Sequence, residues 1–224
     1  MPTVLVTGAN RGIGLEFARQ YARDGWSVVA TARDPSSADD LRALAADVRI
    51  EPLDMRDFPA LAAFPERLGG NPLDLFIANA GMKAPERIDS PDAAEGWQEA
   101  HAVNAVAPTL LAEALLPSVR AARGAMVAIT SRMGSIADSS GGYIGYRASK
   151  AALNAAWRAL ALELAGEPVT LAMFHPGWVK TRMGGPNAPF PLADSVVAMR
   201  KVIADLTPED SGAFLDYRGE PLPW

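Results

Sequence analysis

The fold is decided by the stretch Thr3-Val4-Leu5-Val6-Thr7-Gly8-Ala9-Asn10-Arg11-Gly12-Ile13-Gly14, in which a short apolar run passes directly into a glycine-rich turn. Ile13, Phe17 and Tyr21 then recur at helical spacing, so the pattern predicts a buried strand, a turn and a helix. Glycines let the backbone turn sharply and let a phosphate group come close, while the first N–H groups of a helix favour negative charge.

The spacing of this turn, Gly-x-x-x-Gly-x-Gly, differs from the Gly-x-Gly-x-x-Gly fingerprint and from a phosphate loop with its lysine. A purely structural turn is therefore the competing interpretation. Because the turn stands between a buried strand and a helix, we favour a dinucleotide site. Six residues of the turn are candidates for cofactor binding: Gly8, Asn10, Arg11, Gly12, Ile13 and Gly14.

Apolar runs and helical patterns alternate along the rest of the chain. Further strands are predicted over 26–31, 48–53, 73–78, 126–130, 169–174 and 212–216, and helices over 41–46, 95–116, 146–164 and 195–206. Most of these strands are unbroken apolar runs, which is typical of a parallel sheet covered by helices on both faces. Right-handed crossovers then make the sheet doubly wound. The sequence predicts an α/β fold, a single Rossmann domain over 1–224 with a parallel sheet of about seven strands.

Ligands of such folds bind at the carboxyl ends of the strands. Five residues fall at predicted strand ends: Gly8, Asp54, Asn79, Ser131 and Pro176. Asp54 has two interpretations, an acceptor for the adenine amino group of a cofactor or an N-cap for the next helix. The small residues of Asn79-Ala80-Gly81 suit a close backbone approach to a ligand or to a neighbouring turn.

Tyr146 and Lys150 are four residues apart at the start of a predicted helix, so their side chains share one face. A neighbouring cation favours the anionic form of a phenol, so we expect Lys150 to lower the pKa of Tyr146 and to make it an acid/base group. The competing interpretation is a surface lysine one turn from a half-buried aromatic. Tyr143 is a second candidate tyrosine, but Arg147 stands four residues after it, and an arginine cannot exchange protonation states.

Asn104 lies in the predicted helix 95–116, for which Pro108 suggests a break. Alanines and valines surround this amide, and a buried amide needs hydrogen-bond partners. The alternative is an asparagine on the solvent face of the helix.

Composition narrows the classes of function. The 224 residues carry a net charge of -5 and no basic run, so nothing favours nucleic acid as a partner. There is no cysteine, and His101 and His175 are the two histidines, so no metal site is expected. No apolar run approaches the roughly 20 residues that span a bilayer, and the first residues do not resemble a signal peptide. We expect no membrane span and a cytoplasmic protein.

Together, these motifs resemble those of the short-chain dehydrogenase/reductase family over nearly the whole chain. The glycine turn is similar to the family's cofactor turn, Asn79-Ala80-Gly81 to its strand-four motif and Tyr146-Arg147-Ala148-Ser149-Lys150 to its catalytic helix. Within the family, the C-terminal region most resembles the C-factor and Sniffer-type carbonyl reductases. Asn104 and Ser131 fall where the family's other catalytic residues are expected, and Pro176, Gly177, Val179 and Thr181 resemble the segment beside the nicotinamide.

The resemblance implies hydride transfer between a nicotinamide and a carbonyl or alcohol carbon. Tyr146 is then expected to exchange the proton, Ser131 to hydrogen-bond the same oxygen, and Lys150 to bind the nicotinamide ribose. Asn104 is expected to hold a water next to Lys150. Ser131 lies 15 residues before Tyr146, farther than is common in the family, so Ser135 competes for its role.

Two other functions compete with an oxidoreductase. A serine hydrolase is disfavoured because the sequence has no Gly-x-Ser-x-Gly motif. A catalytically silent protein that senses dinucleotides or signals on the same fold is the better alternative, although such a protein is expected to have lost one of the four catalytic positions.

NADP(H) is expected in preference to NAD(H). The second strand ends in Thr31-Ala32-Arg33, without the acid that would repel a 2'-phosphate, and Arg33 and Arg11 can offer donors to that phosphate. Asp34 next door speaks against this preference. A substrate loop rich in glycine and proline is expected over 178–192. The alanine-rich helices leave a homodimer or homotetramer open.

Overall fold

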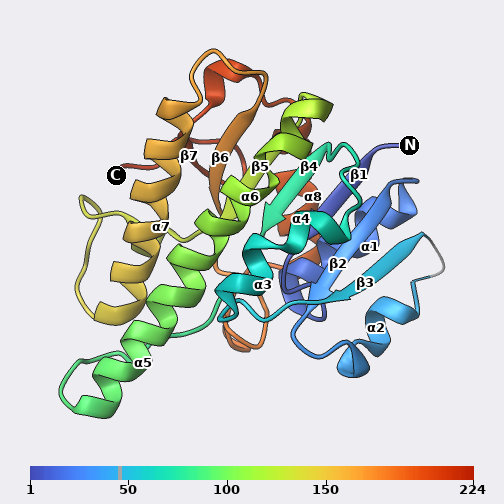
Figure 1. The fold of residues 1–224 in the computed structure, drawn as a ribbon. Helices are drawn as coiled ribbons and strands as arrows, with labels where there is room; N and C mark the ends of the chain where they lie inside the picture. Colours follow the sequence, from blue (N-terminus) through green and yellow to red (C-terminus); the bar gives the residue numbers. More distant parts are fainter. Residues whose placement is uncertain (45–46) are drawn as a thin grey trace.

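A computed structural model describes residues 1–44 and 47–224. Seven strands form one sheet in the order β3-β2-β1-β4-β5-β6-β7, and each neighbouring pair is parallel (Figure 1). The strands are β1 (Thr3–Val6), β2 (Ser27–Ala32), β3 (Val48–Pro52), β4 (Leu75–Ala78), β5 (Ala125–Ile129), β6 (Thr170–His175) and β7 (Ala213–Asp216). The order runs outward in both directions from β1, so the prediction of a doubly wound parallel sheet is confirmed.

Helices cover both faces of the sheet. The α-helices are α1 (Gly12–Arg23), α2 (Asp39–Arg42), α3 (Phe58–Ala62), α4 (Phe64–Arg67), α5 (Pro91–His101), α6 (Ala107–Ala122), α7 (Ile144–Glu163) and α8 (Leu192–Ala204). Three 3-10 turns, η1 (Pro35–Ser37), η3 (Arg132–Gly134) and η4 (Pro208–Asp210), and one π-helical turn, η2 (Ala102–Val106), complete the described elements. The predicted helix 41–46 ends in two residues that lie outside the described part of the chain.

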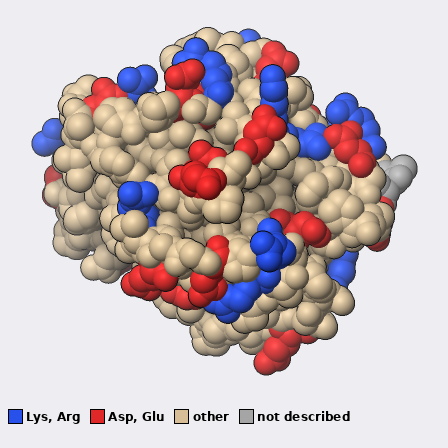
Figure 2. All heavy atoms as spheres, turned by 90° about the horizontal axis from the view of Figure 1, so that it is seen from above, with Lys and Arg blue, Asp and Glu red and all other residues tan. Residues whose placement is uncertain are grey.

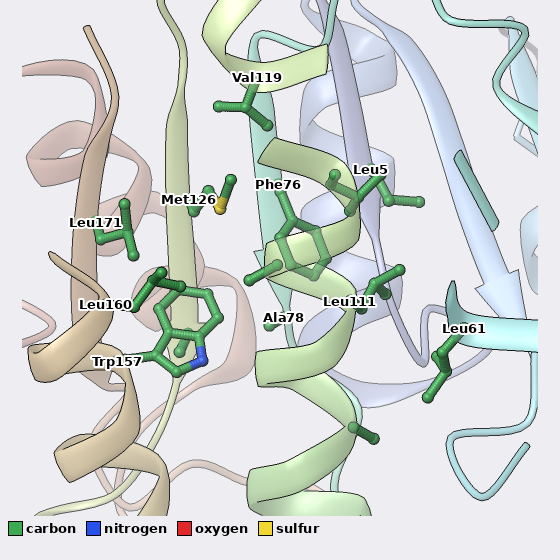
Figure 3. Close-up of a cluster of buried hydrophobic side chains, with 14 of the residues drawn as sticks. Leu5, Leu61, Phe76, Ala78, Leu111, Val119, Met126, Trp157, Leu160 and Leu171 are labelled. Carbon is green, nitrogen blue, oxygen red and sulfur yellow. The ribbon is translucent and has the colours of Figure 1, made fainter. Parts of the chain in front are cut away.

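Each face of the sheet has its own apolar core, since successive side chains of a strand point to opposite faces. In β1, Val4 and Val6 pack with α1 and α8, whereas Leu5 packs with α3, α6 and α7. Figure 3 shows the second of these cores, where the rings of Phe76 and Trp157 lie 6.3 Å apart between their centroids. Val4, Leu5 and Val6 are all fully buried, on alternating faces, which explains why β1 reads as an unbroken apolar run.

The long helical stretch before β5 differs from its prediction. Ser90 caps α5, because its hydroxyl accepts a hydrogen bond from the Ala93 N–H at 3.1 Å. The irregularity lies in η2, around Asn104, and not at Pro108. Pro108 stands in the first turn of α6, where the lack of a backbone N–H costs little free energy.

The same stretch bears on membranes. Pro91–Ala122 is 32 residues long with a mean hydropathy of 1.4 in its most apolar window, so length and composition alone would allow it to cross a bilayer. This contrasts with the expectation that no segment comes near that length. Within that window 56% of the residues are buried inside the protein, and a core helix meets the same criteria.

Figure 2 shows the face at the amino ends of the strands, opposite the end at which α7 starts. Positive and negative side chains are interspersed there, and neither sign covers a continuous area. This face therefore carries no single-sign field that would attract a polyanion.

Candidate active site

The sheet order places β1, β4, β5 and β6 side by side, so that the segments after their carboxyl ends gather at one edge. Gly8, Asn79, Ser131 and Pro176 follow these four strands. The helix α7 begins at the same edge of the sheet (Figure 1). The topology thus brings together residues that lie far apart in the sequence.

The glycine turn after β1 is tied to the end of β4. The Thr7 hydroxyl accepts hydrogen bonds from the N–H groups of Asn79 at 3.0 Å and Ala80 at 3.1 Å. In return, the side-chain amide of Asn79 donates to the Thr7 carbonyl oxygen at 2.9 Å and to the Gly8 carbonyl oxygen at 3.2 Å. Asn79 therefore braces the neighbouring turn, one of the two roles that its small surroundings suggested.

Two glycines of the turn, Gly8 and Gly12, adopt left-handed backbone conformations that favour the absence of a side chain. Gly8 has a φ of 63°, and a Cβ built on it would lie 3.0 Å from the Ala80 Cα. Gly12 has a φ of 58°. Arg11 occupies the N-cap of α1, and its side chain accepts no hydrogen bond from the helix, so the first N–H groups are left to other acceptors.

Asn104 is fully buried, which excludes the solvent-face alternative. Its Oδ1 accepts from the Met82 N–H at 2.8 Å, and its Nδ2 donates to the Met82 carbonyl oxygen at 2.9 Å and to the Ser149 Oγ at 3.0 Å. The Ser149 hydroxyl in turn donates to the Tyr146 carbonyl oxygen at 2.9 Å. Asn104, which lies in a π-helical turn of the kind that often marks a functional position, is thus connected through Ser149 to α7 (Ile144–Glu163).

Lys150 is buried at the same site. Its Nζ donates to the Ile129 carbonyl oxygen at 2.9 Å, at the end of β5. The Asn104 Oδ1 and the Lys150 Nζ would lie 3.2 Å and 3.7 Å from a Cβ built on Gly81. Because Gly81 has no side chain, the amide and the amine can approach the same point.

Burial dominates the pKa values of Tyr146 and Lys150. Burial raises the pKa of Tyr146 to about 12, and the nearby Ser131 hydroxyl offsets part of this rise. Burial also lowers the pKa of Lys150 to about 8. The Lys150 Nζ lies 6.0 Å from the ring centroid of Tyr146 and donates to the Ile129 carbonyl oxygen, and burial dominates the pKa of Tyr146 in this structure. A lowering of this pKa by Lys150 stays a prediction.

Ser135 and Tyr143, the alternatives to Ser131 and Tyr146, have different surroundings from those two residues. The Ser131 hydroxyl lowers the pKa of the Tyr146 phenol. The hydroxyl of the buried Ser135 instead accepts from the Asp138 N–H at 3.0 Å. Tyr143 is half exposed and forms the N-cap of α7 with a φ of 50°. Arg147, four residues after it, donates to the Gly141 and Gly142 carbonyl oxygens. The effect of Ser131 on the pKa of Tyr146, and the use of the Ser135 hydroxyl by Asp138, favour Ser131 over Ser135 as the partner of Tyr146.

At the ends of β2 and β3 lie Arg33 and Asp54. The Asp54 carboxylate pairs with Arg56 at 2.6 Å, and this hydrogen-bonded guanidinium lowers its pKa, with a smaller contribution from Arg33. Asp54 is not the N-cap of α3, as one interpretation had it, since Asp57 accepts from the Ala60 N–H at 3.0 Å in that position. The role of Asp54 toward adenine stays a prediction.

The segment after β6 folds back on itself. The Trp178 indole donates to the Gly184 carbonyl oxygen at 2.8 Å, and Lys180 and Phe190 are joined by a backbone hydrogen bond of 2.9 Å. Pro176 accepts from the Ser195 hydroxyl at 2.6 Å, which anchors the start of the segment to α8. Val179 is buried, and the Thr181 hydroxyl accepts from the Gly184 N–H at 3.0 Å.

Two contributors had no role assigned from the sequence. Thr7 and Ser149 belong to the quoted motifs, yet only their neighbours in space show what their hydroxyls bind. Small hydroxyl residues beside glycines or a catalytic helix give no pattern of their own. Within residues 1–44 and 47–224, no group of three or more metal-binding side chains is arranged to hold an ion.

Comparisons with known proteins agree with this arrangement. A family model described as short chain dehydrogenase matches residues 2–190. The C-signal of Myxococcus xanthus is 42% identical over 170 residues, which cover 73% of this chain and 100% of C-signal.

Solved structures are similar over the full length. The carbonyl reductase Sniffer of D. melanogaster superposes with a TM-score of 0.90 at 30% identity, covering 100% of both chains. The NADPH-bound carbonyl reductase from chicken fatty liver has a TM-score of 0.88 at 36% identity and covers 100% of this chain and 99% of that one.

A doubly wound parallel sheet, with a glycine turn and a Tyr-x-x-x-Lys helix at one edge, defines the Rossmann-like class of nucleotide-dependent oxidoreductases. The chain belongs to the short-chain dehydrogenase family. The resemblance to Sniffer-type carbonyl reductases, predicted from the sequence, is confirmed.

Proposed function

We propose that the protein is an NADP(H)-dependent oxidoreductase in which Tyr146 acts as the general acid and base on a small carbonyl or alcohol substrate. The observation that carries this proposal is the grouping of Asn104, Ser131, Tyr146 and Lys150 at one edge of the sheet, through buried hydrogen bonds and the effect of Ser131 on the phenol. When bound, the cofactor supplies or accepts the hydride.

The chain's own residues supply the proton and its control. A phenol whose pKa is about 12 is protonated at neutral pH, which suits a proton donor to the alkoxide that forms in carbonyl reduction. The Ser131 hydroxyl would hydrogen-bond the same substrate oxygen. Lys150, inside hydrogen-bond reach of the β5 end, would bind the nicotinamide ribose, and Asn104 would hold a water beside it.

The turn and its surroundings fit a dinucleotide. Gly8 and Gly12 adopt left-handed backbone conformations, and α1 begins without a side-chain cap. We propose that NADP(H) is preferred, because neither Arg11 nor Arg33 forms an ion pair with another residue in the described part of the chain and both are exposed. The Asp34 carboxylate accepts hydrogen bonds from the Ser36 N–H at 2.9 Å and the Ser36 hydroxyl at 2.6 Å, so this acid has partners other than Arg33.

The test is turnover of a panel of aldehydes, ketones and quinones with NADPH and with NADH. Tyr146→Phe is expected to abolish turnover while the NADPH dissociation constant changes by less than about twofold, because only the transferable proton is removed. Tyr143→Phe is the matched control and should be mild. An inactive Tyr143 variant beside an active Tyr146 variant would contradict the assignment.

A catalytically silent sensor or signalling protein is the second candidate, since a 42% identical relative is named C-signal. The four candidate catalytic positions are all kept, and the buried hydrogen bonds of Asn104 to Ser149 and of Lys150 to the Ile129 carbonyl oxygen support the enzyme instead. Binding of NADPH without turnover of any carbonyl or alcohol would favour the silent protein.

We also propose a homodimer or homotetramer. A hollow of about 350 Å³ lies on the outer side of the α5–α6 stretch and α7, and it is lined mainly by small and apolar residues, among them Ala105, Val106, Ala152 and Ala156. Light scattering during size-exclusion chromatography would test this assembly. A cytoplasmic location, tested by cell fractionation, and a substrate loop over 178–192 are proposed with it.

A further inference from the structure

A buried hydrogen bond links the end of β5 to α7 directly beside the candidate catalytic residues. The Thr130 hydroxyl donates to the Asn154 Oδ1 at 2.6 Å, between residues 24 apart in the sequence. Thr130 is 3% exposed and Asn154 is 2% exposed, so water cannot take the place of either partner. Neither residue has a place in the mechanism proposed so far.

The positions of the two residues explain what the bond connects. Thr130 immediately precedes Ser131, and its own N–H donates to the Phe174 carbonyl oxygen at 2.8 Å, which extends the β5–β6 ladder. Asn154 lies one helical turn after Lys150 and two turns after Tyr146, so the three side chains share one face of α7. The bond therefore joins the strand end that carries Ser131 to the helix face that carries the acid and the amine.

A second contact packs the turn after Ser131 against α7. A Cβ built on Gly134 would lie 2.9 Å from the Asn154 Nδ2 and 2.9 Å from the Lys150 carbonyl carbon. The η3 turn thus packs against α7 between these two residues, without space for a side chain. Sideways movement of the turn, and of Ser131 at its N-cap, would have to disturb Asn154.

The amide of Asn154 is not fully satisfied, because its Nδ2 is buried without a hydrogen-bond partner in the described structure. An unpaired buried donor costs free energy that a leucine of similar size would not incur. Among the described residues, the bond between the Asn154 Oδ1 and the Thr130 hydroxyl is the one contact for which an asparagine is needed.

We propose that Thr130 and Asn154 form a positioning pair, whose hydrogen bond sets the distance between Ser131, just after β5, and Tyr146 and Lys150 on α7. The pair touches no substrate and acts through these three residues, so the inference rests on the proposed function. Breaking the bond should slow turnover without weakening the binding of the cofactor.

The test compares Thr130→Val, which keeps the branched shape and removes the hydroxyl, with Thr130→Ser, which keeps the donor. Thr130→Val is expected to lower kcat about 10- to 100-fold, since small misplacements of reacting groups have effects of that size. Its KM and its NADPH dissociation constant, from a fluorescence titration, should stay within about twofold, and Thr130→Ser should stay close to the parent.

Asn154→Leu breaks the same bond from the helix side and provides the measurement if Thr130→Val does not fold. The double variant should be no slower than the slower single variant, because both remove one interaction. Thr170→Val is the matched control: Thr170 is buried at the far end of β6, and its hydroxyl has no hydrogen bond to a described residue. It should retain full kcat.

The outcomes separate the two proposals. Full kcat in Thr130→Val, measured beside an inactive Tyr146→Phe, overturns the positioning pair and leaves the proposed function standing. A loss in Thr130→Ser as large as in Thr130→Val also overturns the pair. A parent protein without turnover, or an active Tyr146→Phe, overturns the function and the pair with it.

Discussion

Gly14→Ala is expected to destabilise the protein, although alanine is normally the better helix former. In an open position inside a helix, the exchange would stabilise by about 0.5–1 kcal/mol. Gly14 lies in the first turn of α1, and a Cβ built on it would lie 2.5 Å from the Asn79 Nδ2 and 2.6 Å from the Gly8 carbonyl oxygen. The methyl group would thus displace the amide that braces the glycine turn through Thr7 and Gly8.

Overpacking of this kind costs about 1–3 kcal/mol, so the net loss should be about 1–2 kcal/mol, a fall in Tm of roughly 2–8 °C at this chain length. Thermal unfolding followed by circular dichroism measures it. Ala155→Gly, on an exposed position of α7, gives the helix preference of alanine in this protein as the control. An unchanged or higher Tm in Gly14→Ala would refute the close packing of α1 on the end of β4.

Four further outcomes are expected. Arg33→Ala should reduce the preference for NADPH over NADH in kcat/KM by about 10- to 100-fold, the equivalent of one hydrogen bond to a charged group. Lys150 loses its proton at a pKa of about 8 in the folded chain and near the ordinary 10.5 when unfolded. Stability relative to Lys150→Met should therefore rise with pH between these values, as urea unfolding would show. Protease nicking within 181–192 should decrease when NADPH is added; equal cutting would count against a closing loop. A chelator should leave the rate unchanged, and a loss restored by a divalent ion would contradict this.

Much of the architecture could be predicted because its causes are local. Unbroken apolar runs such as Leu75–Ala78 occur where a strand is covered on both faces, and the residues that follow such strands meet at one edge of a parallel sheet. For that reason the sequence alone predicts that Ser131 and Asn79 lie at the site. Tyr146 and Lys150 followed from helical periodicity alone.

What could not be predicted depends on contacts between distant segments. Desolvation, and not the lysine one turn away, dominates the pKa of Tyr146, and the sequence does not show how deeply a phenol is buried. Asp54 is paired with Arg56, so its use as a helix cap was a plausible but wrong alternative. The sequence suggests a break of this helix at Pro108 and does not reveal η2, since π turns have no composition that marks them.

The π-helical turn η2 gives the Pro91–Ala122 stretch one residue more than a regular helix of the same length would contain. Removal of one residue from the turn would rotate everything before it by about 100° about the helix axis. That rotation would turn Trp97 away from the start of α7, where its ring approaches Gly145. The irregular turn thus sets how α5 is rotated about the helix axis relative to α7, and with it which side chains of α5 meet the start of α7.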